Sequence, residues 1–193
     1  MAALYSERIE LAFTIMLEAH GLQHRKACLG FEASHVTSVA LIATDFGFDE
    51  DTIIAALLHD TLEDTDFISD LIGSRFGDHV LNMVLDVCEP AKHLPWLERK
   101  LSYVDQLRTT PRYGSLAIAS TDKIHNFSRM VAGIESQSAA FIKAFNAGFD
   151  EMLWYHREVY DTLATRWNHR VLDAHQCQLN AFVTTVTSLS LVP

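Results

Sequence analysis

The stretch Ala55-Ala-Leu-Leu-His-Asp-Thr-Leu-Glu-Asp-Thr65 places four groups that can bind a metal or move a proton directly after an apolar run. These groups are His59, Asp60, Glu63 and Asp64. If the stretch is helical, His59 and Glu63 share one face, because residues four apart stack. Asp60 and Asp64 then form the neighbouring row, about 100° further around the helix axis. His59 and Asp60 can therefore reach one ion from adjacent rows, with the other two carboxylates a turn further along.

The alternative interpretation of this stretch is a solvated polar turn that follows a buried helix. Three carboxylates placed so close together repel one another, and a bound cation would relieve that repulsion. The pattern therefore favours a metal site over a solvated turn.

Length and composition indicate one globular domain, residues 1–193, with a sizeable core. Apolar residues make up 49% of the chain and charged residues 21%, which is too apolar for a disordered protein. The net charge is −10 with histidine neutral, and a field of that sign opposes binding to nucleic-acid backbones and anionic membranes. A small anionic substrate is compatible with this charge if bound cations and a few Arg or Lys side chains reverse the sign locally.

Cysteine usage and the first segment indicate a cytoplasmic protein. Cys28, Cys88 and Cys177 are odd in number and widely spaced, which indicates free thiols in a reducing compartment. Residues Met1–His20 carry charged side chains among the apolar ones and fit neither a signal peptide nor a membrane span.

Hydrophobic periodicity predicts an all-α fold. No pair of segments alternates with period two, and no Asn-Gly or Asp-Gly hairpin signal is present. Ser34 is the predicted N-cap of the second helix, and Asp49 or Asp51 that of a third helix over Thr52–His59. The Thr- and Val-rich segment Val171–Val186 is the weakest helix prediction, because β-branched residues fit helices less well. The other predicted helices cover Ile9–Leu17, Phe67–Phe76, His79–Cys88, Trp96–Leu107, Leu116–Met130, Ala139–Phe145 and Phe149–Trp167.

Two further segments offer ligands for the same ion. His35 lies near the start of the second helix, where a lone histidine is usually structural. Asp122 lies in Thr121-Asp-Lys-Ile-His-Asn126, within an otherwise apolar helix, where a carboxylate needs a partner. Taken alone, Asp122 is more often a salt-bridged core residue than a ligand. His125 has no motif support as a ligand, and Tyr155 is expected to be a core residue.

Together, an imidazole, a His-Asp pair and a distant buried aspartate resemble the HD phosphohydrolase superfamily. Residues Ala55–Asp66 closely resemble the His-Asp-x-x-Glu-Asp segment of the RelA/SpoT-type alarmone hydrolases, and Asp122–Asn126 resembles their Asp-Arg/Lys-Leu-His/Tyr-Asn segment. Leu94–Lys100 and Trp154–Leu163 are similar to later segments of that family, so the resemblance covers roughly residues 19–167. It implies an all-α HD-domain helical bundle and a small stand-alone hydrolase, similar to the metazoan SpoT homologues.

The resemblance also implies a role for each matching residue. The implied ligands of a single Mn²⁺ ion are His35, His59, Asp60 and Asp122. The implied acid/base and water-orienting pair is Glu63 and Asp64. The implied substrate contacts are Arg25, Lys26 and Asn126. Two imidazoles and two carboxylates suit Mn²⁺, Fe²⁺ or Zn²⁺ by ligand type alone, and the resemblance favours Mn²⁺.

The implied activity is removal of the 3′-pyrophosphate from a guanosine alarmone, ppGpp or pppGpp. The run Ala27–His35 lacks the family's Gly-x-Pro-Tyr stretch, which leaves base recognition open. Two alternatives therefore stand: an HD phosphohydrolase acting on NADPH or a nucleoside phosphate, and a catalytically silent nucleotide sensor. The presence of both Glu63 and Asp64 argues against the sensor.

Overall fold

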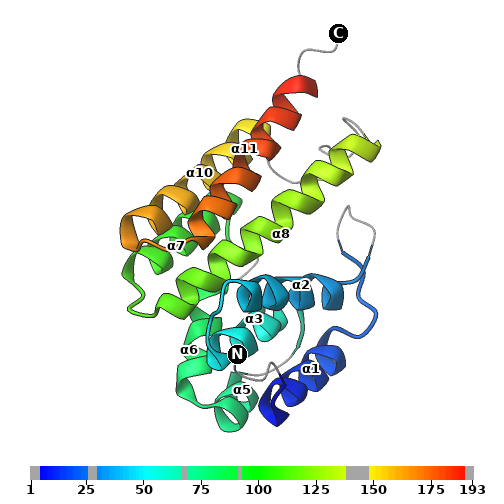
Figure 1. Ribbon diagram of the computed structural model, residues 1–193, viewed down its shortest axis with the longest axis vertical. Coiled ribbons are helices and arrows are strands. Elements are labelled where there is room, and N and C mark those ends of the chain that lie inside the picture. Colours follow the sequence, from blue (N-terminus) through cyan, green and yellow to red (C-terminus); the bar gives the residue numbers. More distant parts are fainter. Residues whose placement is uncertain (1–4, 26–29, 67–68, 91–92, 138–147, 190–193) are drawn as a thin grey trace.

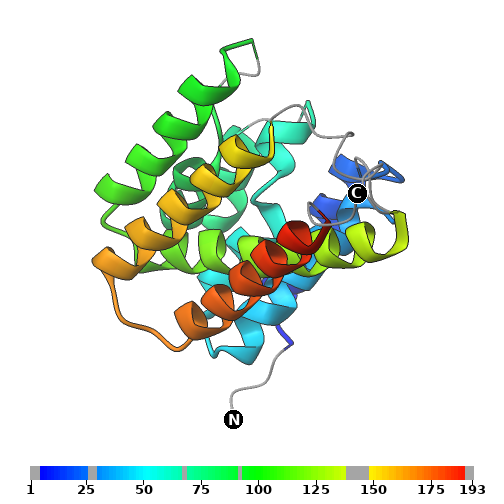
Figure 2. The same ribbon diagram turned by 90° about the horizontal axis from the view of Figure 1, so that it is seen from above.

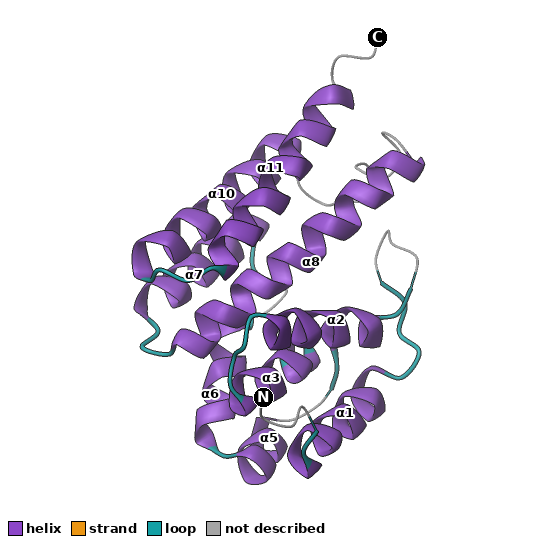
Figure 3. Ribbon diagram, in the orientation of Figure 1, coloured by secondary structure: helices purple, strands orange, loops and turns teal. Residues whose placement is uncertain are grey.

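The computed structural model describes residues 5–25, 30–66, 69–90, 93–137 and 148–189 of the chain. Within these ranges every regular element is a helix, and the only β pairing is an isolated bridge between His24 and Phe31 (Figure 3). The predicted all-α class is therefore confirmed. The predicted helix over Ala139–Phe145 lies outside the described residues. No described helix is both long and apolar enough to cross a bilayer.

The first three helices form the layer that carries the His-Asp stretch. They are α1 (Glu7–His20), α2 (Glu32–Asp45) and α3 (Glu50–Leu58). Asp49, one of the two predicted N-caps, caps the start of α3. Its carboxylate accepts a hydrogen bond from the Thr52 amide at 2.9 Å. Residues 54–58 of α3 are fully buried on all sides, as expected of a helix that is apolar all round. This burial holds the end of α3, and the residues that follow it, in the centre of the molecule.

The prediction that Ser34 caps α2 is wrong, because the helix begins three residues earlier than expected, after Phe31. Ser34 instead lies inside the first turn. Its hydroxyl accepts from the Phe31 amide at 3.2 Å and donates to the Phe31 carbonyl at 2.6 Å. A serine three residues into a helix can therefore satisfy the terminal backbone groups by reaching back, which the sequence pattern does not distinguish from a true N-cap.

A second group of helices follows the His-Asp stretch. They are α4 (Thr61–Asp64), α5 (Ser69–Phe76), α6 (Asp78–Val87) and α7 (Trp96–Thr109). The carboxylate of Asp86 near the end of α6 accepts from Thr110, Arg112 and Ser115 at 2.5–2.7 Å. These bonds tie α6 to the loop after α7 and to the first turn of the next helix.

The long helix α8 (Tyr113–Gln137) runs through the molecule between the N-terminal helices and the last two, α10 (Phe149–Arg166) and α11 (Val171–Leu189) (Figure 1). It packs against α2, α3, α6 and α11. Seen from above, α10 runs alongside α7 (Figure 2). The β-branched residues of α11 do not prevent a helix, because Leu179, Phe182 and Val186 share a face that is buried against Phe127 and Ile134 of α8.

A buried histidine lies where α8, α10 and α11 meet. The His175 ring is fully buried, packs against Phe127 and Tyr160, and its Nδ1 lies 3.1 Å from the Ser120 hydroxyl. Burial, with the nearby charge of Lys123, lowers the pKa of His175 to about 3. The folded protein therefore holds this imidazole neutral.

This neutral histidine predicts acid destabilisation. Its pKa is lower in the folded state than in the unfolded chain, so its contribution to stability is present at neutral pH and is lost as pH falls from about 6.5 toward 3. In the variant His175→Gln, the unfolding free energy should decline less steeply over that range, by up to about 1.4 kcal/mol per pH unit. Urea titrations of both proteins at several pH values measure this. Parallel pH profiles would contradict the prediction.

Candidate active site

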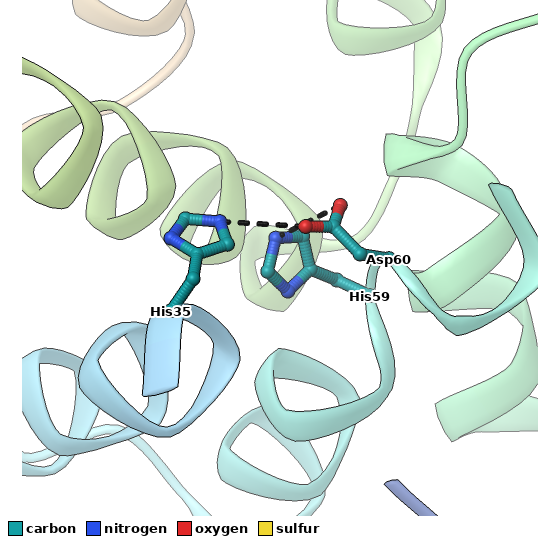
Figure 4. Close-up of side chains that lie close together, drawn as sticks. All are labelled: His35, His59 and Asp60. Carbon is teal, nitrogen blue, oxygen red and sulfur yellow. Dashed lines mark ion pairs between the residues drawn. The ribbon is translucent and has the colours of Figure 1, made fainter. Parts of the chain in front are cut away.

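Four predicted ligands converge at one point, although their helices are far apart in the chain. His35 comes from α2, His59 and Asp60 follow the end of α3, and Asp122 comes from the middle of α8. The Nε2 atom of His35 lies 3.4 Å from Asp60 Oδ2 and 3.2 Å from Asp122 Oδ1. The Nε2 atom of His59 lies 3.2 Å from Asp60 Oδ1 and 3.9 Å from Asp122 Oδ1. Figure 4 shows the side chains of His35, His59 and Asp60 pointing toward one another, and these three form a group that could hold a metal ion.

The His-Asp pair sits at a break between two helices. Helix α3 ends at Leu58, one residue before the predicted end, and α4 begins at Thr61. His59 Nδ1 lies 2.8 Å from the Ala56 carbonyl and thereby satisfies one of the terminal carbonyls of α3. The backbone nevertheless stays in the right-handed helical region at His59 and Asp60. The predicted spacing around the axis is therefore roughly preserved across the break.

The hydrogen bond from His59 determines which of its nitrogens can bind a cation. A carbonyl oxygen only accepts, so Nδ1 must carry a proton and donate to Ala56. A metal-bound imidazole is neutral, so in that state Nε2 holds a lone pair. This buried atom has no hydrogen-bond partner among the described residues and faces an oxygen of Asp60 at 3.2 Å, so two lone pairs would then face each other. A divalent cation between them would satisfy both, so these residues fit a metal ion.

Electrostatics keep the two aspartates of the cluster ionised. Burial opposes ionisation of Asp60, but His59 and His35 outweigh it and hold the pKa of Asp60 well below its usual value. Burial likewise opposes ionisation of Asp122, but the adjacent Lys123 ammonium, 2.7 Å from Oδ2, holds the pKa of Asp122 well below its usual value. Burial alone would lower the pKa of His35, yet hydrogen bonds to Asp122 and Asp60 raise it to about 9. Without a metal, a proton on His35 takes the place of the cation.

Glu63 differs from these aspartates because burial and neighbouring carboxylates dominate its surroundings. Its Oε2 accepts a hydrogen bond from the Glu89 amide at 3.2 Å. Burial, with the charges of Asp60 and Glu89, raises the pKa of Glu63 to about 7. A carboxyl group with that pKa can take up or release a proton near neutrality, which suits a general base or acid. Asp64 lies beside it on the wall of the same cavity.

These side chains line a cavity of about 310 Å³. Two of the predicted substrate contacts, Arg25 and Asn126, lie on its wall. Arg25 donates to Asn126 Oδ1 at 2.9 Å, and its Nε lies 3.4 Å from Glu32. The predicted contact Lys26 lies outside the described residues. The described lysine and arginine side chains on the wall of this cavity are Arg25, Lys100, Lys123 and Arg129.

The cavity has a second wall that sequence reasoning did not assign. Lys100 forms an ion pair with Glu89 and lies 4.6 Å from the centre of the Tyr155 ring. Trp96 lines the same wall. Tyr155 is a buried core residue as expected, but it also borders the cavity. The resemblance of Leu94–Lys100 to a family segment was the signal that could have pointed to this wall. It did not show which of its side chains would face the cavity.

His125 also belongs to the site, although the motif that contains it did not indicate a role as a ligand. Its Nδ1 lies 2.7 Å from Nδ1 of His35 and 3.4 Å from Nη1 of Arg25. Burial, with the positive charges of His35 and Arg25, lowers the pKa of His125 to about 4. This histidine is therefore neutral in the folded protein.

Comparisons with known proteins agree on one family. A family model described as an HD domain matches residues 12–140, which is more than half of the chain. A guanosine-3′,5′-bis(diphosphate) 3′-pyrophosphohydrolase from Aquifex aeolicus is 43% identical over 88 residues, which cover 46% of this chain and 12% of that protein. The mouse guanosine-3′,5′-bis(diphosphate) 3′-pyrophosphohydrolase is 38% identical over 111 residues, which cover 55% of this chain and 60% of that protein. The chain thus spans less than two thirds of either relative.

Two solved structures share the fold. A metazoan ortholog of SpoT, described as hydrolysing ppGpp, matches with a TM-score of 0.75 over 96% of this chain and 98% of that one, at 22% identity. A crystal structure from Listeria monocytogenes EGD-e matches with a TM-score of 0.66 over 76% of this chain and 91% of that one, at 29% identity. Both proteins therefore share the arrangement of helices seen in this chain.

The cluster predicts unequal costs for removing its two aspartates from the metal-free protein. Asp122→Ala leaves the buried Lys123 ammonium without its partner, which typically costs about 3–5 kcal/mol. Asp60→Ala should cost clearly less, because the charge it leaves behind is on His35, which can lose its proton. Urea unfolding of both variants in excess chelator measures the difference. Equal losses of stability in the two variants would show that the buried Lys123 ammonium does not need Asp122 as its partner.

Proposed function

Because the chain belongs to the HD domain family, we propose that it is a metal-dependent phosphohydrolase that removes the 3′-pyrophosphate from ppGpp or pppGpp. The observation that carries this proposal is the convergence of His35, His59, Asp60 and Asp122 on one point, at the wall of a cavity that also exposes Glu63. That combination places a candidate cation site beside a group able to exchange a proton.

The proposed ligands of the cation are the two imidazoles and the two aspartates. Their mixture of nitrogen and oxygen donors suits Mn²⁺, which we propose as the native metal, with Fe²⁺ and Zn²⁺ as alternatives. A divalent ion bound there would supply a Lewis acid that makes water a better nucleophile and polarises a phosphoryl oxygen. The ionised state of Asp60 and Asp122 supports this assignment, since a carboxylate binds a metal only when deprotonated.

Proton transfer is the proposed role of the Glu63 carboxyl group. With a pKa of about 7, Glu63 can accept a proton from the attacking water at neutral pH and return one to the leaving group. The hydrogen bond from the Glu89 amide keeps its carboxyl group in place. We assign Asp64 to orienting the water, supported by its place on the same cavity wall.

The proposed substrate contacts are the cationic and polar groups around the cavity. Arg25 and Asn126, with Lys100 on the second wall, would offset the charge of a polyphosphorylated nucleotide, against the −10 charge of the whole chain. Lys26 is also proposed to contact the substrate, and the sequence motif is the support for this role. The indole and phenol rings of Trp96 and Tyr155 make the second wall partly aromatic, as a nucleotide pocket requires.

The names of the relatives support the alarmone as substrate. The Aquifex and mouse proteins, which match this chain over 88 and 111 residues, are both named as guanosine-3′,5′-bis(diphosphate) 3′-pyrophosphohydrolases. A cytoplasmic location is proposed as well, supported by the free thiols of Cys88 and Cys177. The NADPH and nucleoside phosphate alternatives, and the silent sensor, remain as outcomes of the test below.

A nucleotide panel tests the reaction. The Mn²⁺-loaded protein is incubated separately with ppGpp, NADPH and a nucleoside 5′-monophosphate, and the release of pyrophosphate and phosphate is measured. We expect pyrophosphate and GDP from ppGpp, because the cluster faces a cavity suited to a polyanion. Phosphate released from NADPH or the monophosphate, with none of these products from ppGpp, would favour another HD phosphohydrolase. Binding without release from any of them would favour the sensor.

A single amide substitution tests the role of Glu63. In Glu63→Gln the side chain can still accept the Glu89 amide hydrogen bond but can no longer exchange a proton, so turnover should fall by roughly 10²–10⁴-fold while metal content stays the same. The matched control is Glu98→Gln, the same change at an exposed position on α7 that does not line the cavity. Steady-state kinetics and elemental analysis provide the two measurements. Wild-type turnover in Glu63→Gln would remove Glu63 from the mechanism.

A further inference from the structure

His125 lies behind His35, on the side of that ring away from the proposed metal. Nε2 of His35 faces the two aspartates, whereas its Nδ1 lies 2.7 Å from Nδ1 of His125. The two rings are 4.8 Å apart between centroids and tilted by 43° to each other, so they are not stacked face to face. A hydrogen bond of this length requires one of the two Nδ1 atoms to donate and the other to accept.

Arg25 decides which of the two accepts. Its Nη1 lies 3.4 Å from the same Nδ1 of His125, and a guanidinium group can only donate. Nδ1 of His125 must therefore be the acceptor toward both neighbours and carries no proton. It follows that Nδ1 of His35 is the donor. With that proton fixed on Nδ1, Nε2 is the nitrogen of His35 that can present a lone pair to a cation.

Arg25 orients a second ligand through the neighbouring residue of α8. Its Nη2 donates to Asn126 Oδ1 at 2.9 Å, so the amide oxygen of Asn126 faces Arg25. The amide nitrogen then faces Asp122 and donates to its Oδ1 at 2.5 Å. Glu32, 3.4 Å from Arg25 Nε, holds the guanidinium from the other side. An ion pair from Glu32 of α2 and a set of hydrogen bonds thus connect Arg25 to both His35 and Asp122.

We propose that His125 is a positioning residue for the metal centre: it accepts the Nδ1 proton of His35 and so directs the Nε2 lone pair of His35 toward the cation. This inference rests on the proposed metal site but not on the identity of the substrate. Outer-shell partners of metal-bound histidines typically change metal affinity by roughly 10–100-fold when they are removed. His125 touches no reacting atom in this role, and its effect passes through His35.

Two substitutions at the same position separate this role from simple packing. His125→Phe keeps a ring but removes the acceptor, whereas His125→Asn places an amide oxygen near the position of Nδ1. Mn²⁺ affinity measured by calorimetry should fall about 10–100-fold in His125→Phe and recover to within a few-fold of wild type in His125→Asn. Unchanged affinity in His125→Phe, or equal weakening in both variants with wild-type thermal stability, would overturn the proposal.

A measurement on the wild-type protein covers the case in which His125→Phe does not fold. Nitrogen-15 NMR of the metal-free protein reports which ring nitrogen of each histidine carries a proton. We expect His125 to be protonated on Nε2 alone and His35 to carry a proton on Nδ1. A proton on Nδ1 of His125 would overturn the proposal.

The failures of the two proposals are distinguishable. If the wild-type protein binds no Mn²⁺, the proposed metal site and this inference both fall. If wild-type and His125→Phe proteins bind Mn²⁺ equally, only the inference falls. Neither result depends on whether ppGpp is hydrolysed, which the nucleotide panel measures separately.

Discussion

The buried carboxylate of Asp122 is the constraint on which the site and much of the fold depend. It lies in the middle of α8 among apolar neighbours, where an unpaired charge would be strongly unfavourable. Lys123 satisfies one of its oxygens, and Asn126 and His35 approach the other. These partners come from α8 itself and from α2, so the two helices must pack closely for Asp122 to remain ionised.

The partner of Asp122 extends the same constraint to the other half of the molecule. The Lys123 ammonium lies 5.2 Å from the centre of the Tyr103 ring on α7 and 5.6 Å from that of Tyr155 on α10. Cation–π contacts of this kind gain strength when they are shielded from water, as they are here. The charges of the candidate site therefore also hold α7, α8 and α10 together. Substitutions in this cluster are expected to change stability and metal binding together.

The carboxyl groups around the cavity fall into two classes according to what lies against them. Asp60 and Asp122 have imidazole or ammonium neighbours and remain ionised, as metal ligands must. Burial, with the nearby carboxylates of Asp60 and Glu89, moves the pKa of Glu63 up toward neutrality. The motif His-Asp-x-x-Glu-Asp brings both classes into one short stretch. Their opposite pKa shifts, however, depend on partners contributed by α2, by α8 and by Glu89, which follows the end of α6.

The sequence by itself determined the all-α class and the side chains that cluster around the candidate site, including His35, His59, Asp60 and Asp122. It could do so because helical periodicity and short motifs are local properties of the chain. Only the tertiary structure decided that Ser34 lies inside α2, that His125 contacts His35, and that Lys100 faces the cavity. A periodic pattern shows which face of a helix is buried but not what it is buried against. His125, which contacts His35, and Asn126, which contacts Arg25, lie 90 residues or more along the chain from these partners, and packing alone brings them together.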